Sequence, residues 1–355
     1  MKSKHVGALA LMATGALAGQ AQAQVTIYGL VDAAVQTTSG QPGGQANRLI
    51  SGGIQGSRYG FKGSEDLGGG LKVVFELENQ FAVDTGANKS SAQSFSRKAL
   101  VGLSGDFGKV TVGRQTTVSY DAQSDLDPVQ FANFTPLGNS GDAPALKFAD
   151  YQVVNARRDN AVKYSLETNG LLVGAMVALG EQAGSTRAGS SLGLRVGYSG
   201  GGFSAQAAYD ETRDNASAKA TGLTLGGSYT LGDFTAYLGT AQVKNDFQSA
   251  GGFGRKNTVW WLGGRYALTP QFALHLAYYD QKQTGTTNAK GVATPDGNGK
   301  ARTYSLLADY LLSKRSDVYI ALQSTQLKDG MIAQMAANGT SSTVTTVLAG
   351  MRHKF

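Results

Sequence analysis

Apolar and polar side chains alternate along most of the chain with the period of two that is typical of β-strands. In the stretch RYALTPQFALHLAYYDQ (265–281), Phe272, Leu274 and Leu276 alternate with smaller or polar residues. Such a strand has one strongly apolar face and one face that accepts both small and polar side chains. Every apolar run after Ala23 is broken within a few residues, and helical periodicity is scarce. The pattern therefore predicts an all-β chain without membrane-spanning helices.

Short turns and longer polar stretches connect the predicted strands in alternation. The seven turns are SEDLGGG at Ser64, SGDFGK at Ser104, ETNG at Glu167, SGGG at Ser199, TLGD at Thr230, LTPQ at Leu268 and LSKRSD at Leu312. The longer stretches lie at 83–94, 180–190, 244–256, 283–301 and 328–343. Seven hairpins and one more strand at each chain end give sixteen strands. An even number, with short turns on one rim and long loops on the other, is typical of outer-membrane barrels.

Aromatic residues flank four of these turns. The pairs are Tyr198 and Phe203, Tyr229 and Phe234, Tyr266 and Phe272, and Tyr310 and Tyr319. An amphipathic ring finds both of its preferred environments at the boundary of a bilayer, so we expect these residues to form a collar on the turn side. A soluble β-sandwich also alternates, but its turns need no aromatic collar. The pattern favours a transmembrane antiparallel β-barrel.

The first 23 residues have the parts of a secretory signal peptide. Two lysines precede the apolar run 6–18, and the small-residue site AQA follows at 21–23. We predict cleavage after Ala23, which leaves residues 24–355 as the barrel. The apolar run is too short for a membrane anchor. The chain has no cysteine, which excludes disulfides and thiolate metal sites.

The last strand, TTVLAGMRHKF, ends the chain on an aromatic residue. Val347, Met351 and Phe355 share one face, while Leu348 and Arg352 share the other. Such an ending resembles the C-terminal signature by which outer-membrane barrels are recognised for assembly. We therefore interpret Phe355 as an assembly signal for the barrel-assembly machinery. The alternative is a strand that happens to stop at Phe.

Several segments together resemble the successive blocks of the Gram-negative general porins, in particular the betaproteobacterial type. They are VTIYGLVDAAV from Val25, SRYGFKGSEDLGGGLKVVFELE from Ser57, RKALVGLSGDFGKVTVGRQ from Arg97, NAVKYS from Asn160 and GMRHKF from Gly350. These blocks extend from one end of the mature chain to the other. The resemblance implies a homotrimer of sixteen-stranded barrels in the bacterial outer membrane. Each barrel would hold a water-filled pore, narrowed by a long third loop folded inside.

The candidate for that loop is the stretch of about 116–156, which lacks a clean strand pattern. A connection of this length is uncommon unless it is functional. It either projects outside or packs within the barrel. Its apolar residues need burial and its aspartates need water, which favours packing against the inner wall. We predict that Asp121, Asp125 and Asp127 face the channel.

Strand parity turns the basic residues of the neighbouring strands inward, because a guanidinium near the lipid midplane costs about 2 to 4 kcal/mol. Tyr59 and Phe61 are expected to face lipid, which directs Arg58 and Lys62 to the lumen. Leu100 is likewise expected to face lipid and Arg97 the lumen.

In the strand after the third loop, Val162 and Tyr164 set the outer face. Arg157, Asp159 and Lys163 are therefore expected inside, whereas Arg158 has the wrong parity unless it lies in the loop. In related porins, arginines matching Arg58, Arg97 and Arg157 line the constriction, and the resemblance implies the same role here. Glu76 and Glu78 would temper this positive wall. Arg114, also predicted to line the pore, either anchors the third loop or lies near the subunit contact.

Arginines opposite loop aspartates would create a transverse field that attracts anions and orients polar solutes. We predict a channel for passive diffusion of small hydrophilic solutes and ions, with mild anion preference. For any single arginine, an ion pair that stiffens the wall is the alternative. For the whole chain, a solute-specific porin or a surface adhesin barrel remains the alternative. Beyond a second copy of the chain and solutes in transit, the expected partners are outer-membrane lipid and lipopolysaccharide.

An enzyme is not expected. The mature chain has two histidines, His275, predicted inward, and His353, and neither has an evident catalytic partner. The sequence contains no phosphate-binding loop and no zinc pattern, so no cofactor or metal is predicted. The pI of about 9.3 is compatible with a polyanionic partner. The charges are nevertheless dispersed over alternating strands, which argues against nucleic acid.

Overall fold

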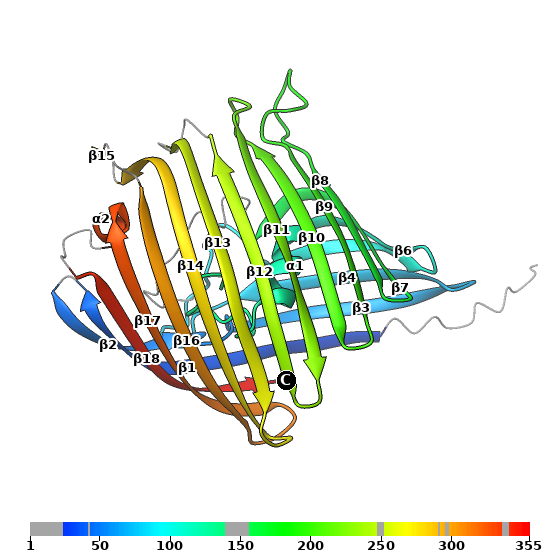
Figure 1. Cartoon of the computed structure of the whole chain (residues 1–355). Helices are drawn as coiled ribbons and strands as arrows, with labels where there is room; N and C mark the ends of the chain where they lie inside the picture. The colour runs from blue at the N-terminus through cyan, green and yellow to red at the C-terminus, as the bar shows by residue number, and fades with distance from the viewer. Residues whose placement is uncertain are drawn as a thin grey trace, which may run out of the picture.

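The protein is a closed antiparallel β-barrel (Figure 1). The computed structural model describes residues 24–41, 43–138, 156–246, 252–289, 292–294, 298–335 and 341–355. The first strand, β1 (Gln24–Gln41), pairs with the last, β18 (Thr343–Lys354), and this pairing closes the sheet. The predicted signal peptide lies outside the described residues. Within them, no helix is both long and apolar enough to cross a membrane.

Neighbouring strands in sequence are neighbours in the wall. The other strands are β2 (Gly44–Ser51), β3 (Arg58–Gly68), β4 (Leu71–Gln80), β5 (Lys98–Gly105), β6 (Gly108–Thr116), β7 (Arg157–Thr168), β8 (Leu171–Ala178), β9 (Ser191–Gly200), β10 (Phe203–Arg213), β11 (Lys219–Leu231), β12 (Phe234–Asn245), β13 (Gly252–Ala267), β14 (Phe272–Ala289), β15 (Val292–Thr294), β16 (Gly299–Leu311) and β17 (Ser316–Asp329). The two helices are α1 (Val118–Leu126) and α2 (Gly330–Met335).

The eighteen named strands make sixteen positions in the wall, which confirms the predicted strand number. Both β2 and β3 pair with the same side of β1, β2 along its second half and β3 along its first half. They are therefore two parts of one wall strand, interrupted at residues 52–57. The short β15 pairs with the end of β14 and extends that hairpin.

The seven predicted turns all join consecutive strands at one rim, where Figure 1 shows the tight hairpins of β9 to β14. Between β9 and β10, Gly201 and Gly202 both have positive φ, 60° and 80°. A two-residue hairpin turn of this kind needs such angles and so favours glycine. At the other rim, strand structure extends farther than expected, because β14 and β16 take up much of the predicted loop 283–301.

The outer surface carries the apolar half of the alternation. In β9, Leu192, Leu194 and Val196 are 43 to 54% exposed, while Ser191 before them and Gly193 between them are buried. Soluble proteins bury such side chains, but here they form the surface that contacts lipid.

The predicted aromatic collar is largely present. Tyr198, Phe203, Tyr229, Phe234, Tyr266 and Tyr310 are exposed on the turn side. The prediction for Tyr319 is wrong: this residue is buried, because Ile320 and Leu322 take the outer face, and its hydroxyl donates to Asp32 inside the barrel.

A second aromatic row lies toward the loop rim, on β13, β14 and β16. The rings of Trp260 and Tyr278 have centroids 5.1 Å apart, and those of Tyr278 and Tyr304 are also 5.1 Å apart. These residues flank no turn, so the turn pattern that predicted the first aromatic collar does not predict this row.

The third loop folds inside the barrel, as expected. Figure 1 shows α1 within the ring of strands, and the helix contacts β9, β10 and β11. Thr117 caps the helix by accepting a hydrogen bond from the backbone amide of Tyr120. The loop's apolar residues Leu126 and Phe134 are fully buried, and the indole of Trp261 donates to the carbonyl of Leu126 over 2.9 Å. Residues 139–155 of this loop lie outside the described residues.

Candidate functional site

Three arginines that are far apart in sequence meet on the inner wall. Arg58 begins β3, Arg97 immediately precedes β5 and Arg157 begins β7. The Glu78 carboxylate joins two of them, with its oxygens 2.5 Å from Nε of Arg97 and 3.6 Å from Nε of Arg58. The guanidinium of Arg157 lies over the ring of Tyr120 on α1, 5.5 Å from its centroid. We call Arg58, Arg97 and Arg157 the arginine cluster.

Arg97 reaches this cluster by a different route from the one expected. Leu100 does not face lipid: it lines a lumenal cavity, and Val101 and Leu103 take the outer face of β5. By alternation alone, Arg97 would then point outward. It lies before the strand begins, however, so its side chain is free to turn inward to Glu78 and Gln80.

Glu76 and Glu78 both project from β4 to the inner side of the wall. Glu76 accepts a hydrogen bond from the hydroxyl of Tyr28 over 2.7 Å and pairs with Lys98 at 2.9 Å. Lys62 lies over the Tyr28 ring, 5.1 Å from its centroid. The two carboxylates therefore neutralise part of the positive wall and hold its side chains in place.

A β-bulge turns Arg158 inward as well. The register between β6 and β7 moves from Gly113↔Ala161 to Gln115↔Arg158, so β7 holds one extra residue. Asn160, inside this bulge, has a φ of 53°. The guanidinium of Arg158 donates to the hydroxyl of Thr212 on the inner face of β10. The parity conflict seen in the sequence is thus resolved by the extra residue.

Two other predictions for this region, those for Asp159 and Arg114, are wrong. Asp159 lies on the exposed rim of the strand and not on the inner wall, and it pairs with Arg114 at 2.6 Å. Arg114 alternates with Val110 and Val112 on the outer face of β6, where Val112 is 50% exposed. The prediction that Arg114 lines the pore is therefore wrong.

The aspartates of the third loop divide into two groups. Asp121 and Asp125 project from α1 and pair with Lys163 and Arg195 on the inner wall. Half of the Asp125 side chain is exposed. These two acids therefore join the helix to β7 and β9 and leave part of their charge in the lumen.

Asp127 does not face the channel, contrary to the prediction. It is buried where the loop meets β14, and it accepts hydrogen bonds from the Val129 amide over 2.7 Å and from the Tyr279 hydroxyl over 3.2 Å. Burial raises the pKa of Asp127 to about 6, although these hydrogen bonds oppose the rise. Its role in the structure is to fasten the loop to the wall. The inward His275 does the same through the carbonyl of Pro128.

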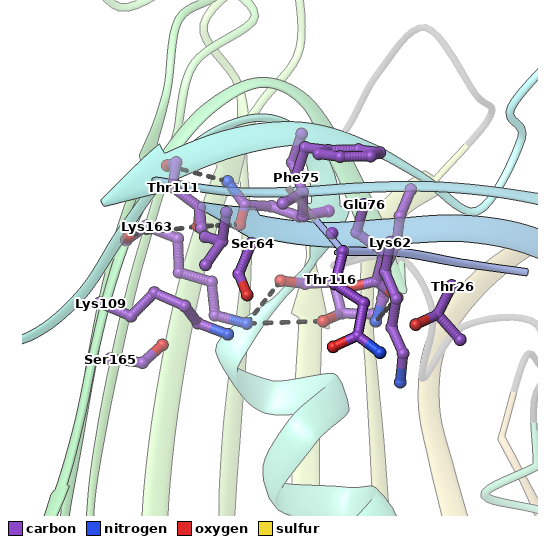
Figure 2. Close-up of a pocket in the computed structure, with 16 residues that line it drawn as sticks. Thr26, Lys62, Ser64, Phe75, Glu76, Lys109, Thr111, Thr116, Lys163 and Ser165 are labelled. Carbon is purple, nitrogen blue, oxygen red and sulfur yellow. Dashed lines mark hydrogen bonds and ion pairs between the residues drawn. The ribbon is translucent and has the colours of Figure 1, made fainter. Parts of the chain in front are cut away.

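Two open cavities lie along the inner wall near the start of α1. The first, of about 360 Å³, is lined by Lys62, Lys98, Lys109 and Lys163 together with hydroxyl and amide side chains (Figure 2). The second, of about 400 Å³, shares Lys109 and Lys163 and adds Arg195. Figure 2 shows the amino ends of Lys109 and Lys163 side by side above the helix.

Lys98, Lys109 and Arg195 were missed by the sequence analysis. Strand alternation would have found Lys109, which alternates with Val110 and Val112, and Arg195, which lies between Leu194 and Val196. Around the two cavities and the arginine cluster, basic side chains outnumber acidic ones. The basic residues are Arg58, Lys62, Arg97, Lys98, Lys109, Arg157, Arg158, Lys163 and Arg195; the acidic ones are Glu76, Glu78, Asp121, Asp125, Glu167 and Asp210.

The C-terminal residue lies on the outer face. Phe355 is 44% exposed, and its backbone exchanges two hydrogen bonds with Gly29 of β1, of 3.0 and 3.1 Å. Its ring occupies the space where a side chain at position 29 would lie. The placement agrees with the predicted lipid-facing row, and the assembly role of Phe355 stays a prediction.

Known proteins share both the sequence pattern and this architecture. Outer membrane porin protein 32 of Delftia acidovorans is 28% identical over 380 aligned positions, which cover all of both chains. The solved anion-selective porin from Comamonas acidovorans superposes with a TM-score of 0.75 at 25% identity, over 94% of this chain and all of the other. A trimer form of OmpT from Vibrio cholerae shares the fold, with a TM-score of 0.67 at 18% identity, over 94% and 99% of the two chains.

A match to a protein-family model identifies the family of this chain. Residues 7–330, most of the chain, match the model of the Gram-negative porin. The barrel, the inward third loop and the charged lumen are the structural counterparts of that match. The chain therefore belongs to the Gram-negative porin family and is an outer-membrane β-barrel channel.

Proposed function

We propose that this porin lets small hydrophilic solutes diffuse passively and prefers anions, with the arginine cluster as the selecting element. The observation that carries the proposal is the excess of basic side chains where α1 narrows the lumen. Guanidiniums keep their charge at all relevant pH values, and in a narrow, water-poor ring their field is strong.

Arginines of the wall opposite aspartates of the third loop were expected to create the field across the pore, but the ion pairs of these acids are arranged differently. The acids nearest to the arginine cluster are Glu76 and Glu78 on the same wall, whereas Asp121 and Asp125 are already paired with basic residues of the wall. The net field is therefore positive over much of the passage, which favours anions over cations. The anion-selective porin with the similar structure agrees with this proposal.

Reversal potentials in a planar bilayer under a salt gradient test the proposal. Replacing Arg58, Arg97 and Arg157 together with Ser should lower the anion-to-cation permeability ratio by about threefold or more, because the change removes three permanent positive charges from the proposed constriction. Low salt is the informative condition, since screening at physiological ionic strength acts within about 8 Å.

The matched control replaces three exposed basic residues away from the lumen, Arg187, Lys314 and Arg315, with Ser. This variant loses the same formal charge and should keep the ratio of the wild-type protein. An equal drop in both variants would assign selectivity to net charge, and an unchanged ratio in the first would refute the role of the cluster.

We further propose that the protein assembles as a homotrimer and contacts outer-membrane lipid, including lipopolysaccharide. Support for the trimer comes from the family resemblance and from the OmpT trimer with the same fold. Support for lipid contact comes from the apolar outer surface and its two aromatic rows.

A further inference from the structure

Five glycines on the inner face of the wall lie beneath the third loop. They are Gly174 of β8, Gly193 of β9, Gly226 of β11, Gly239 of β12 and Gly263 of β13. Each has the parity of inward residues in its strand, such as the buried Met176 in β8 and Trp261 in β13. None of the five has a positive φ, so their backbone conformation does not require glycine. We call these five residues the glycine floor.

Close approach of the third loop is what requires glycine at these positions. A Cβ at Gly193 would lie 2.8 Å from Cγ2 of Val118, the first residue of α1, and a Cβ at Gly174 would lie 3.3 Å from Cγ1. Just beyond the helix, a Cβ at Gly263 would lie 2.6 Å from Cβ of Pro128. Carbon atoms in contact are about 3.5 to 4.0 Å apart. The loop therefore occupies the space that side chains of the floor would need.

The last turn of α1 lies on the same floor. A Cβ at Gly226 would lie 3.0 Å from Cδ1 of Leu126. At Gly239 it would overlap the indole of Trp261, which donates a hydrogen bond to the Leu126 carbonyl over 2.9 Å. Gly226 and Gly239 stand directly opposite each other in the sheet. Both ends of the helix are thus in contact with glycine positions of the wall.

The other side of α1 borders the pore. Residues two apart in an α-helix point to nearly opposite sides. Val118 faces the floor, whereas Tyr120 extends to the arginine cluster, where the guanidinium of Arg157 lies 5.5 Å from its ring centroid. The next residue, Asp121, pairs with Lys163 on β7. The distance between the helix and the floor therefore determines how much room remains between the helix and the wall of β3 to β7.

We propose that the glycine floor sets the depth at which the third loop lies and thereby determines the size of solute that the channel passes. Protein interiors are close-packed, so a methyl group added to the floor displaces what lies on it. Here the displaced element is α1, and the displacement narrows the passage on its other side. This inference rests on the proposed diffusion of solutes through the pore and is independent of the proposed preference for anions.

The test adds one methyl group under the start of α1 with Gly193→Ala. Single-channel conductance in concentrated salt and the largest neutral polyethylene glycol that enters the pore are measured in a planar bilayer. We expect conductance to fall by about 1.5-fold or more and the size limit to move to smaller polymers, because overpacking displaces the helix into the passage. The control, Gly264→Ala, adds the same methyl group on the outer face beside the exposed ring of Phe234 and should change neither quantity.

A rescue variant distinguishes displacement of the loop from a folding defect. Val118→Ala removes the γ carbons that face the floor, so its combination with Gly193→Ala should regain at least half of the lost conductance. Recovery is partial because a Cβ at Gly193 would also lie 2.6 Å from Oδ1 of Asp210. Val118→Ala alone should conduct like the wild type. Gly174→Ala, with its milder contact, should show a smaller loss and replaces Gly193→Ala if that variant does not assemble.

Unchanged conductance and size limit in the floor variants would overturn the proposal. So would a loss of conductance that the Val118→Ala change does not restore, or an equal loss in the outer-face control. Reversal potentials under a salt gradient should be the same in all of these variants. Failure of the glycine floor would therefore leave the proposed ion preference standing, and failure of that preference would leave the floor standing.

Discussion

Glu78 determines how much positive charge the arginine cluster presents to the pore. Its carboxylate contacts Arg58 and Arg97 and also accepts a hydrogen bond from Tyr28 over 3.1 Å. A single buried acid thus orients two guanidiniums and offsets one of their charges. This makes the residue a more sensitive probe of selectivity than any one arginine.

Replacing Glu78 with Gln should raise the anion-to-cation permeability ratio by about twofold or more, because it removes a negative charge and keeps the shape of the side chain. Reversal potentials at low salt provide the measurement. Glu65→Gln, at an exposed position of the same hairpin, is the control and should leave the ratio unchanged. A ratio that falls in the Glu78 variant would mean that ordering of the arginines matters more than net charge.

At the scale of elements, the bulge of β7 decides which side chains line the pore. The extra residue turns Arg158 inward and leaves Asp159 at the exposed rim, while the side chain of Arg157 still lies beside Tyr120 inside the barrel. Asn160 tolerates the positive φ that the bulge requires, whereas a β-branched residue does not.

Asn160→Val should therefore lower the free energy of unfolding by about 1 to 2 kcal/mol, while Asn160→Gly should be close to neutral. Urea-induced unfolding in detergent micelles measures both. Asn47→Val, at an exposed position of β2 without positive φ, should cost much less than Asn160→Val. Equal losses for Val and Gly at position 160 would show that the side chain, not the backbone angle, is what matters.

The last strand carries a prediction about assembly. Phe355 lies on the outer face at the seam between β18 and β1, outside the lumen. Deletion of Phe355 should reduce the amount of protein in the outer membrane severalfold and leave the conductance of each assembled channel unchanged. Surface labelling and single-channel recording separate the two effects. Normal surface levels after the deletion would refute the assembly role.

For the whole molecule, the closed sheet determines how the protein resists denaturation. Pairing of β1 with β18 leaves no free strand edge in the wall, so unfolding must break several ladders together. We expect a trimer that survives unheated denaturing electrophoresis and separates into monomers on boiling. Migration of only the monomer from unheated samples in mild detergent would contradict the trimer.

The alternation and turn patterns were enough to predict the barrel, with its sixteen wall strands, its turn rim and most of its inward and outward faces. These features are local, because a period of two and turn-forming residues act over a few positions. Inward placement of Arg58, Lys62 and Lys163 followed directly from their apolar neighbours. Arg58, Arg97 and Arg157 were identified as a group through the family resemblance.

Features that depend on strand register and on contacts between distant segments could not be predicted from local patterns and became visible in the folded barrel. The bulge at Asn160 adds one residue to β7 and so changes which side chains before it face the lumen. The neighbouring residues in the sequence give no signal that predicts this bulge. Asp127 was predicted to face the channel because it lies in the third loop. In the folded barrel it is buried, because the loop packs against Tyr279 of β14. Likewise, the five glycines of the glycine floor come together only because strand pairing brings them beneath the third loop. Local patterns determine which face a residue occupies, and pairing between strands determines what it meets there.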